Sequence, residues 1–559
     1  MKRSLVIIGI CFFSTNVLGD QIMTARAKDF IARHEAKMKP LEIAAGLAWW
    51  DANTTGDQAA FARKEKVQNQ IDEALSNPER FKEIKALKEN RDKIDDRILA
   101  RGVDLLFLQY LEKQVPLDLL KKITSLSNKV EQAFNAFRPV LNGNEGSENL
   151  VRSILKNSLD SGQRKEAWEA GKKVGAILEK DLRELVKARN EAARILGFAH
   201  FHELQLHLNE QNGKELLRLF NELDDLVRAP FSQVKEEIDA KLATQLKIQK
   251  SDLMPWHYHD PFFQEAPAIF GVNLDGPFVK ADLLDFSLKF YDSIGLPIGR
   301  VIARSDLYEK KGKSPHAFCT DIDRAGDVRV LANIKQDDYW ASTLLHEFGH
   351  AVYSSLNIPD TLPYILRGEA HILTTEGVAM MFERLTKKSA LLKALGLTVP
   401  DPASYDKAAL KNLQHRLLIF SRWCQVMFRF EKRMYENPDQ DLNALWWSLV
   451  EKYQGLRKPP GRNAPDYASK IHVVSAPVYY HNYMMGELFA SQVHRAICDS
   501  LYPEKRAEEV IYFGDLRVGK FMKEKVFAPG KTLPWNELTR HATGKELSPA
   551  AFARDFRSE

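Results

Sequence analysis

Cysteine is scarce in this chain. Four cysteines among 559 residues exclude a small domain held together by disulfides. Glycine (29) and proline (24) are also too few for a fibrous or low-complexity protein. Neither sign of charge dominates, because 80 basic residues balance 75 acidic ones, and no long run of lysine and arginine occurs. This balance gives no support to a nucleic-acid partner.

Long hydrophobic runs are missing too. After the first twenty residues, no segment approaches the roughly 18 uninterrupted apolar residues of a membrane-spanning helix. We therefore expect a soluble mature protein with no stable membrane insertion. What the chain does contain is 44% hydrophobic and 28% charged residues. That composition can build a large packed core and excludes gross disorder.

The N-terminus has the composition of an export signal. A basic start, Met1–Arg3, precedes the apolar residues 5–13, and small residues follow up to Gly19. We predict a signal peptide over 1–19 and an exported protein, either periplasmic or extracellular. An uncleaved membrane anchor is the alternative. The mature chain keeps three scattered cysteines, and we expect the fold not to depend on disulfides, although one pair can still form: Cys319, Cys424 and Cys498.

Apolar residues recur at three- and four-residue spacing through most of the remaining chain. Residues 172–197 show this pattern, with charged residues between the apolar positions and Gly197 as a stop. We interpret nearly all of these apolar stripes as core packing. Similar patterns predict helices at 24–45, 58–112, 117–137, 213–245, 407–436 and 503–525.

Few segments interrupt the helices. Residues 138–149 are rich in turn formers, and 251–276 form a long irregular connection. Strand patterns are sparse, and His316–Thr320 and Val328–Ile334 are expected to pair as a small hairpin. Few flexible linkers occur. We therefore predict a mainly α fold in which residues 20–559 form a single helical domain, with two lobes around a deep central cleft.

The motif H-E-x-x-H occurs within a helical pattern. His346 and His350 are four residues apart and so lie on one face of a helix, where both imidazoles can reach one Zn²⁺. Glu347 lies about 100° around the helix from His346, on the side where a water molecule held by the metal would be. Zinc lowers the pKa of such a water to about 7, and the carboxylate can then accept its proton. The alternative is a pair of ordinary helix histidines.

A catalytic zinc needs a third protein ligand and an open fourth position. We favour Glu376, which begins an otherwise apolar helix 26 residues after the motif, where an unpaired carboxylate is costly. Its competitors are Glu369, His371 and Glu383. We expect Glu383 instead to face solvent or to pair with Arg384 or another neighbour.

Peptide hydrolysis also needs donors for the oxyanion of the tetrahedral intermediate. The segment KIHVVSAPVYYHNY, residues 470–483, is dense in such groups. Tyrosines in such a segment can equally be packing residues. The segment is therefore a candidate second half of the site.

These motifs together resemble the angiotensin-converting enzyme family, the peptidyl-dipeptidase A zinc carboxypeptidases. Thimet-type oligopeptidases are more distantly similar. The likeness extends over about residues 22–525: AWWDANTT at 48–55 is similar to the family's early tryptophan–asparagine segment, and 164–204 to its helical pair. The resemblance implies a gluzincin-type helical peptidase with Zn²⁺ as cofactor and oligopeptides as substrates.

Two segments are similar to the family's substrate-binding residues. The sequence SPHA resembles its His-Ala strand, which implies that His316 hydrogen-bonds the peptide and that Ala317 pairs with the peptide as an added strand. The sequence KIH matches the family's Lys-x-His. This implies that Lys470 holds the C-terminal carboxylate of the substrate, with Tyr480 as a second contact.

The resemblance also implies catalytic roles. The three metal donors named above would carry the zinc, and Glu347 would be the base and later the proton donor. His472 would bind the backbone near the scissile bond, and Tyr483 would stabilise the oxyanion. One residue is inserted between His472 and Tyr483 relative to the family.

The chain departs from the family at several positions. Asn482 stands where chloride-activated members have an arginine, so we expect no chloride dependence of the usual kind. Met380 stands where the family has an aspartate that orients a zinc histidine, so another residue or water must support His346. Cys498 has no partner at the spacing of the animal enzymes. The chain is thus similar to a divergent, bacterial-type member.

We predict a zinc peptidyl-dipeptidase that releases dipeptides from the C-terminus of oligopeptides. An alternative within the same zinc class is an oligoendopeptidase. An alternative outside the enzymes is a non-catalytic peptide-binding protein on this fold. Such a protein is expected to lose residues such as Glu347 and Tyr483, and both are present. The sequence leaves the oligomeric state open.

Overall fold

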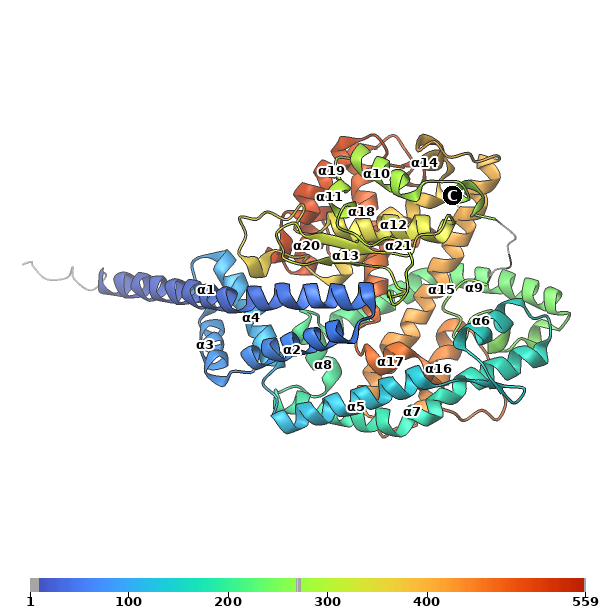
Figure 1. Ribbon diagram of the computed structural model, residues 1–559, viewed down its shortest axis with the longest axis horizontal. Coiled ribbons are helices and arrows are strands. Elements are labelled where there is room, and N and C mark those ends of the chain that lie inside the picture. Colours follow the sequence, from blue (N-terminus) through green and yellow to red (C-terminus); the bar gives the residue numbers. More distant parts are fainter. Residues whose placement is uncertain (1–9, 268, 270–272, 557–559) are drawn as a thin grey trace, which may run out of the picture.

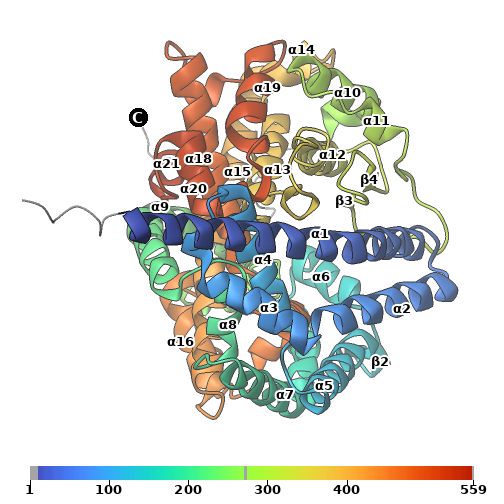
Figure 2. The ribbon, with the colours of Figure 1, turned by 90° about the vertical axis from the view of Figure 1, so that its left-hand side faces the viewer.

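The computed structural model describes residues 10–267, 269 and 273–556, which are mainly helical (Figures 1 and 2). The predicted mainly α fold is confirmed. The predicted signal peptide starts outside the described residues. Among the described helices, none combines the length and the apolar character that a bilayer span requires.

Four N-terminal helices cover one side of the molecule (Figure 2). They are α1 (Ile10–Thr55), α2 (Gln58–Leu75), α3 (Pro78–Glu89) and α4 (Arg97–Glu112). The prediction of one helix over 58–112 is wrong, because the side chains of Asn77 and Asp96 accept hydrogen bonds from backbone N–H groups at the starts of new helices. Pro78 reinforces the break as the first residue of α3.

The lower half of the molecule in Figure 1 is built around long helices that pack along one another. A minimal hairpin of β1 (Val140–Leu141) and β2 (Asn144–Glu145) occupies the turn-rich stretch that the sequence indicates. The helices of this half are α5 (Leu117–Ala136), α6 (Glu148–Asn157), α7 (Ser161–Ile195), α8 (Phe201–Leu208), α9 (Gly213–Leu246), α16 (Leu442–Gln454) and α17 (Ile471–Ser475).

The upper half holds the remaining C-terminal helices (Figure 1). One long helix, α15 (Pro402–Glu436), crosses from this half to the lower one, and its residues Trp423, Cys424 and Phe428 are fully buried. The main hydrophobic core includes residues of both halves and of α15. The helices of the upper half are α10 (Leu283–Ser293), α11 (Gly299–Ile302), α12 (Asp338–Val352), α13 (Ile372–Glu383), α14 (Ser389–Ala394), α18 (His481–Leu501), α19 (Leu516–Met522), α20 (Trp535–Thr543) and α21 (Ala550–Arg554).

The predicted hairpin is confirmed. Strands β3 (Phe318–Asp321) and β4 (Val328–Leu331) pair antiparallel, with Phe318 opposite Leu331 and Asp321 opposite Val328. The three cysteines beyond the predicted signal peptide are all free in this structure.

The continuous helix predicted over 503–525 is wrong. Within it, Tyr512 and Gly514 adopt positive φ angles of 63° and 80°, which end any helix. Asp515 then caps the short helix α19 by accepting from the Arg517 N–H. The apolar spacing of this stretch therefore comes from several short turns that pack on the core.

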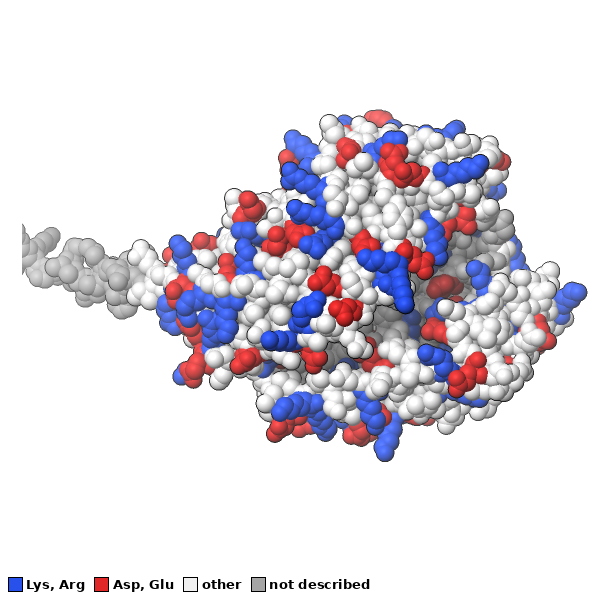
Figure 3. Space-filling model, in the orientation of Figure 1, with Lys and Arg blue, Asp and Glu red and all other residues white. Residues whose placement is uncertain are grey.

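A hollow opens between the two halves of the molecule in the space-filling view (Figure 3). Basic and acidic side chains are intermixed on this face, in keeping with the balanced composition. The H-E-x-x-H helix, α12, and the helix that follows it, α13, lie in the upper half next to this division.

Candidate metal centre and peptide cleft

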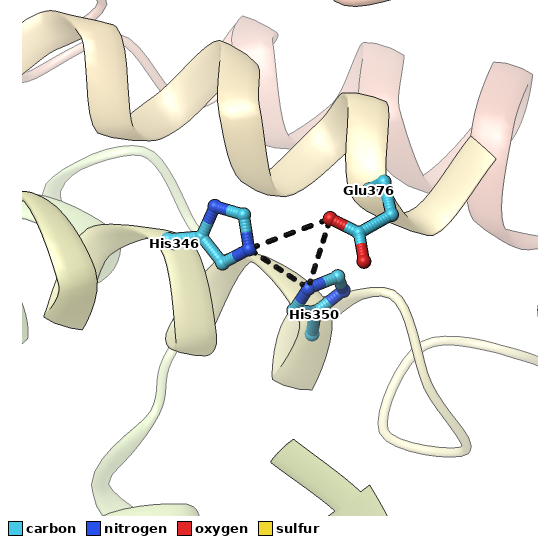
Figure 4. A group of neighbouring side chains, drawn as sticks. All are labelled: His346, His350 and Glu376. Carbon is cyan, nitrogen blue, oxygen red and sulfur yellow. Dashed lines mark hydrogen bonds and ion pairs between the residues drawn. The ribbon is translucent and has the colours of Figure 1, made fainter. Parts of the chain in front are cut away.

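Three potential metal donors converge from two helices (Figure 4). The Nε2 atoms of His346 and His350, one turn apart on α12, lie 3.1 Å from each other. The Glu376 Oε2 atom of α13 lies 3.6 Å from the first and 3.9 Å from the second of these nitrogens. The structure thus brings together the three residues that the sequence singled out, and it leaves Glu369 and His371 outside the group.

The spacing of these donors fits a zinc ion. Four ligand atoms at about 2.0–2.2 Å around a tetrahedral zinc are separated from one another by roughly 3.3–3.6 Å. The observed separations of 3.1 to 3.9 Å bracket this range. Two imidazoles and one carboxylate are also a donor set that zinc accepts at catalytic sites with an open fourth position.

Three glycines allow the helices of this centre to approach closely. A Cβ atom on Gly349 of α12 would lie 2.8 Å from the Ala379 Cα of α13. A Cβ atom on Gly377 of α13 would lie 2.7 Å from the Gly486 carbonyl oxygen of α18, and one on Gly486 would lie 3.1 Å from the Glu376 Cβ. Because glycine lacks a side chain, the backbones can meet at these points. The glycines therefore set where Glu376 stands relative to α12.

The Nδ1 atoms of both histidines, on the side of each ring away from the three donors, have hydrogen-bonding partners. His346 Nδ1 lies 2.7 Å from Glu383 Oε2, and His350 Nδ1 lies 2.7 Å from Thr375 Oγ1. Bonds of this kind fix the tautomer that leaves Nε2 free for a metal. Arg416 of α15 donates to the other Glu383 oxygen over 3.1 Å and so fixes the carboxylate in turn.

For Glu383, the expected solvent exposure and the expected pairing with Arg384 are wrong, whereas pairing with another neighbour, Arg416, is confirmed. The Glu383 side chain is 18% exposed and bonds His346, while Arg384 pairs with Glu487. Glu383 lies seven residues after Glu376, two helical turns further along the same face, which explains how it reaches the back of His346. It supplies the support that Met380, at the family's aspartate position, cannot give.

Glu347 is buried beside the metal donors. Burial raises the pKa of its carboxyl to about 7, the nearby His346 opposes this rise, and the Glu376 carboxylate adds to it. The backbone N–H of Cys319 on β3 donates a hydrogen bond to the Glu347 carboxylate. The hairpin therefore positions the carboxylate as well as forming a wall of the site.

A cavity of about 660 Å³ contains the metal donors, Glu347 and Tyr483. This volume is within the range of about 300–1,000 Å³ that is usual for ligand sites. Ala317 lines the cavity together with strand β3, as an added-strand contact requires. His316 is exposed and is not among the lining residues, so the structure does not bring it to the metal centre.

A row of aromatic rings extends from the cavity into the lower half. The ring of Tyr483 lies 5.4 Å from that of Tyr480 and 6.3 Å from that of His472. Tyr479, which the sequence reasoning missed, is hydrogen-bonded to the Tyr483 side chain, and their rings are 5.2 Å apart. Burial and the Glu376 carboxylate raise the pKa of Tyr483, so its hydroxyl keeps the proton that an oxyanion donor needs.

His472 has a free hydrogen-bonding atom in this row. Its ring lies 4.9 Å from that of Tyr480, and its buried Nδ1 makes no hydrogen bond with any described residue. Burial, aided by the charge of Lys470, lowers the pKa of His472 to about 4, so the imidazole is neutral at pH 7. A buried polar atom without a partner is costly, and a peptide group would satisfy it.

Lys470 ends the row. Its Nζ donates to Gln264 Oε1 over 2.6 Å and lies 5.5 Å from the centre of the Tyr480 ring. Burial lowers the pKa of Lys470 to about 8, and the Asp260 carboxylate opposes this fall. Gln264 belongs to the irregular stretch 251–276, where no periodic pattern marks it as part of a site. Sequence reasoning therefore had no signal for it.

Asn482 is buried next to this row. Its side-chain oxygen accepts from Gln211 Nε2 over 2.7 Å, and the Oε1 of Gln211 lies 2.8 Å from His481 Nε2. Asn482 is thus bonded to neutral groups, and the absence of chloride dependence stays a prediction.

A helical body whose cleft contains an H-E-x-x-H helix and a third carboxylate donor defines a metallopeptidase. Comparison with known proteins specifies the family. The sequence profile of the angiotensin-converting enzyme family matches residues 22–258 and 280–557, which is most of the chain. The chain therefore belongs to the angiotensin-converting enzyme family.

Individual relatives are distant and longer. Angiotensin-converting enzyme of Theromyzon tessulatum is 22% identical over 429 residues, which cover 72% of this chain and 69% of that protein. The angiotensin-converting enzyme-related protein of Drosophila melanogaster is 23% identical over 255 residues, covering 43% of this chain and 40% of that protein. Angiotensin-converting enzyme of Bos taurus is 22% identical over 425 residues, covering 70% of this chain and only 32% of that protein.

Proposed function

We propose that this protein is a zinc peptidyl-dipeptidase that releases C-terminal dipeptides from oligopeptides. The observation that carries the proposal is the row that joins Lys470, through Tyr480 and Tyr483, to the cavity with the metal donors. A peptide carboxylate bound at Lys470 would place a short, fixed length of chain between its C-terminus and the metal centre. An enzyme that always releases two residues must bind the terminal carboxylate at a fixed distance from the metal centre, and Lys470 provides such a cation.

The residues of the cleft have complementary tasks in this proposal. Lys470, Gln264 and Tyr480 bind the terminal carboxylate, and the neutral His472 donates to or accepts from the peptide backbone. The backbone of Ala317 pairs with the substrate as an edge strand. His316 is assigned to substrate binding by the resemblance alone, and its exposed position requires it to turn inward when peptide binds.

Proton transfer in the proposal rests on Glu347 and Tyr483. A zinc ion held by His346, His350 and Glu376 would supply Lewis-acid chemistry, polarising the scissile carbonyl and making a water molecule more acidic. Glu347 takes the proton from the attacking water and passes it to the leaving amine. The Tyr483 hydroxyl donates a hydrogen bond to the oxygen that becomes negative.

The proposal extends to processing, localisation and chloride. We propose that residues 20–559 form one peptidase domain after removal of 1–19, and that the protein is exported, to the periplasm or the extracellular space. Turnover would not need chloride of the usual kind, because Asn482 and Gln211 bond to each other.

A defined octapeptide with a free or an amidated C-terminus tests the proposal. With Zn²⁺ present, mass spectrometry should show loss of a C-terminal dipeptide from the free acid, and chelator should abolish it. Amidation removes the charge that Lys470 binds and should raise KM at least about tenfold, the effect of losing a hydrogen bond to a charged group. Internal cleavage of both peptides at equal rates would favour the oligoendopeptidase instead. Binding without any cleavage would favour the non-catalytic alternative.

A further inference from the structure

The metal cavity has a second cationic wall, formed by Lys531 and Arg367. Lys531 lies in a short helical turn, Gly530–Thr532, and its Nζ makes no hydrogen bond or ion pair with any described residue. Arg367 donates from Nε to the Leu362 carbonyl oxygen over 2.6 Å, and no ion pair joins it to a carboxylate within the described part of the chain. Two cations that face the same cavity are thus without carboxylate partners.

The other charged groups at this wall form no hydrogen bond or ion pair with Lys531 in the described part of the chain. Arg324 is paired with Glu42 at 3.0 Å. Asp321 accepts from the backbone N–H groups of Ser355 and Arg324, both over 2.9 Å. Glu369 lines the same wall, and burial raises the pKa of its carboxyl while the charge of Lys531 opposes this rise. The Lys531 Nζ and the Arg367 Nη groups therefore remain open to hydrogen bonds from an anionic group of a ligand.

Lys531 is also held in place. Its carbonyl oxygen accepts from Arg101 Nε over 2.8 Å, and Arg101 is itself paired with Glu210. Its methylene chain packs on Gly368, where a Cβ atom would lie 3.1 Å from the Lys531 Cε. Burial lowers the pKa of Lys531 to about 8, and Arg324 adds to this fall while Glu369 opposes it. A fixed, half-buried lysine without a partner is already partly desolvated in the free protein, so binding of an anion costs less further desolvation.

Lys531 and Lys470 reach the metal centre along different walls. Lys470 connects to the cavity through Tyr480 and Tyr483, whereas Lys531 belongs to the wall of Gly368 and the far end of β3. A peptide whose C-terminus is at Lys470 would pass the metal donors and continue along β3 toward Lys531. We propose that Lys531, with Arg367, forms a subsite that selects an acidic side chain N-terminal to the scissile bond.

This inference rests on the proposed function and is tested with peptide pairs. In each pair, glutamate or glutamine occupies one of the three positions before the scissile bond, and kcat/KM is measured with zinc-loaded protein. At one of these positions the glutamate peptide should be preferred about two- to fivefold, the size of a partly exposed charge pair. Lys531→Met, which keeps the packing on Gly368, should remove the preference, and Lys531→Glu should transfer it to lysine-containing peptides. Lys525→Met, at an exposed lysine six residues away, is the matched control and should keep it.

A binding measurement distinguishes whether the proposed subsite or the proposed peptidase activity is wrong. The same peptide pairs are titrated against zinc-loaded Glu347→Gln protein, with and without Lys531→Met, and Kd is compared. Equal cleavage and equal binding of glutamate and glutamine peptides at all three positions, or a preference that survives Lys531→Met, overturns the subsite. A glutamate preference in Kd that depends on Lys531, without cleavage by the wild type, upholds the subsite and overturns the peptidase.

Discussion

At the scale of single residues, the candidate metal centre owes its order to atoms on the far side of the two imidazole rings. The two imidazoles present Nε2 to the cavity because their Nδ1 atoms are bonded to Glu383 and Thr375. The Glu383 carboxylate is fixed by Arg416 on another helix. Met380, one turn before Glu383, lines the cavity without a polar group to offer.

Replacing Glu383 with alanine should therefore weaken zinc binding about 10- to 100-fold, as loss of such a partner usually does. The affinity is measured by competition with a chromophoric chelator. The double variant Glu383→Ala with Met380→Asp should recover part of the loss, because it returns a carboxylate to the same face of α13. Glu537→Gln, an exposed position on α20, serves as the control. Unchanged zinc affinity in Glu383→Ala would show that this carboxylate does not support the centre.

The sequence predicts local parts of this site better than distant ones. The spacing of His346 and His350 determines their common face on a helix, and the apolar surroundings of Glu376 mark it as a bound carboxylate. Glu383 shares that face at two turns, so the same periodicity indicates it once the helix bounds are known. Gln264 and Lys531 are joined to the site only by tertiary packing, and no nearby pattern distinguishes them from other polar residues.

At the scale of elements, the turn between α17 and α18 sets the position of the aromatic row. Within this turn, Val478 adopts the left-handed conformation with φ of 56°, which is costly for a β-branched side chain. The buried carboxyl of Glu431 on α15 accepts a hydrogen bond from the Val478 N–H over 3.0 Å. This bond helps to hold the strained turn that leads into Tyr480 and Tyr483.

Glu431→Leu should lower the free energy of unfolding by about 1–3 kcal/mol, because it leaves the buried Val478 N–H without an acceptor. Glu431→Gln keeps an acceptor and should cost much less. Burial raises the pKa of Glu431 to about 8 from a usual value of 4.5, and the Val478 hydrogen bond opposes this rise. The folded chain thus keeps a proton that the unfolded chain loses, so this group lowers stability as pH rises from about 4.5 to 8.

Chemical denaturation at pH 5.5 and pH 8.5 measures the free energy of unfolding of both variants and its dependence on pH. From pH 5.5 to pH 8.5, the free energy of unfolding should fall more for the wild type than for Glu431→Gln, because glutamine does not titrate. A difference that is the same at both pH values would mean that Glu431 does not titrate as its burial implies.

Helix types were easier to predict than helix bounds. The apolar stripe of 58–112 continues across two breaks because all three helices bury a face against the same small core. Only the side chains of Asn77 and Asp96, acting as caps, divide it. Both residues are also common inside surface helices and loops, so their presence alone does not fix a boundary.

At the scale of the whole molecule, the site lies where two helical halves meet. A cavity of about 660 Å³, lined by β3, α12, α13 and Tyr483 of the upper half, accepts an extended chain, but a folded domain is too large to enter it. The same ten-residue sequence should therefore be cleaved as a free peptide and resist cleavage as the C-terminal strand of a stable folded domain. Product formation is measured by mass spectrometry, with a flexible C-terminal tail on the same domain as control. Equal cleavage of strand and tail would show that the cleft is more open than this structure.

The close helix crossings at Gly349, Gly377 and Gly486 have a consequence for assembly of the protein. Glu376 faces the two histidines only after α13 has settled between α12 and α18, and residues on all three helices belong to one hydrophobic core. A newly made chain therefore brings the three candidate donors together only after the segment from α12 to α18, residues 338–501, has packed. In the proposed function, peptidase chemistry would be absent from a chain until that packing is complete.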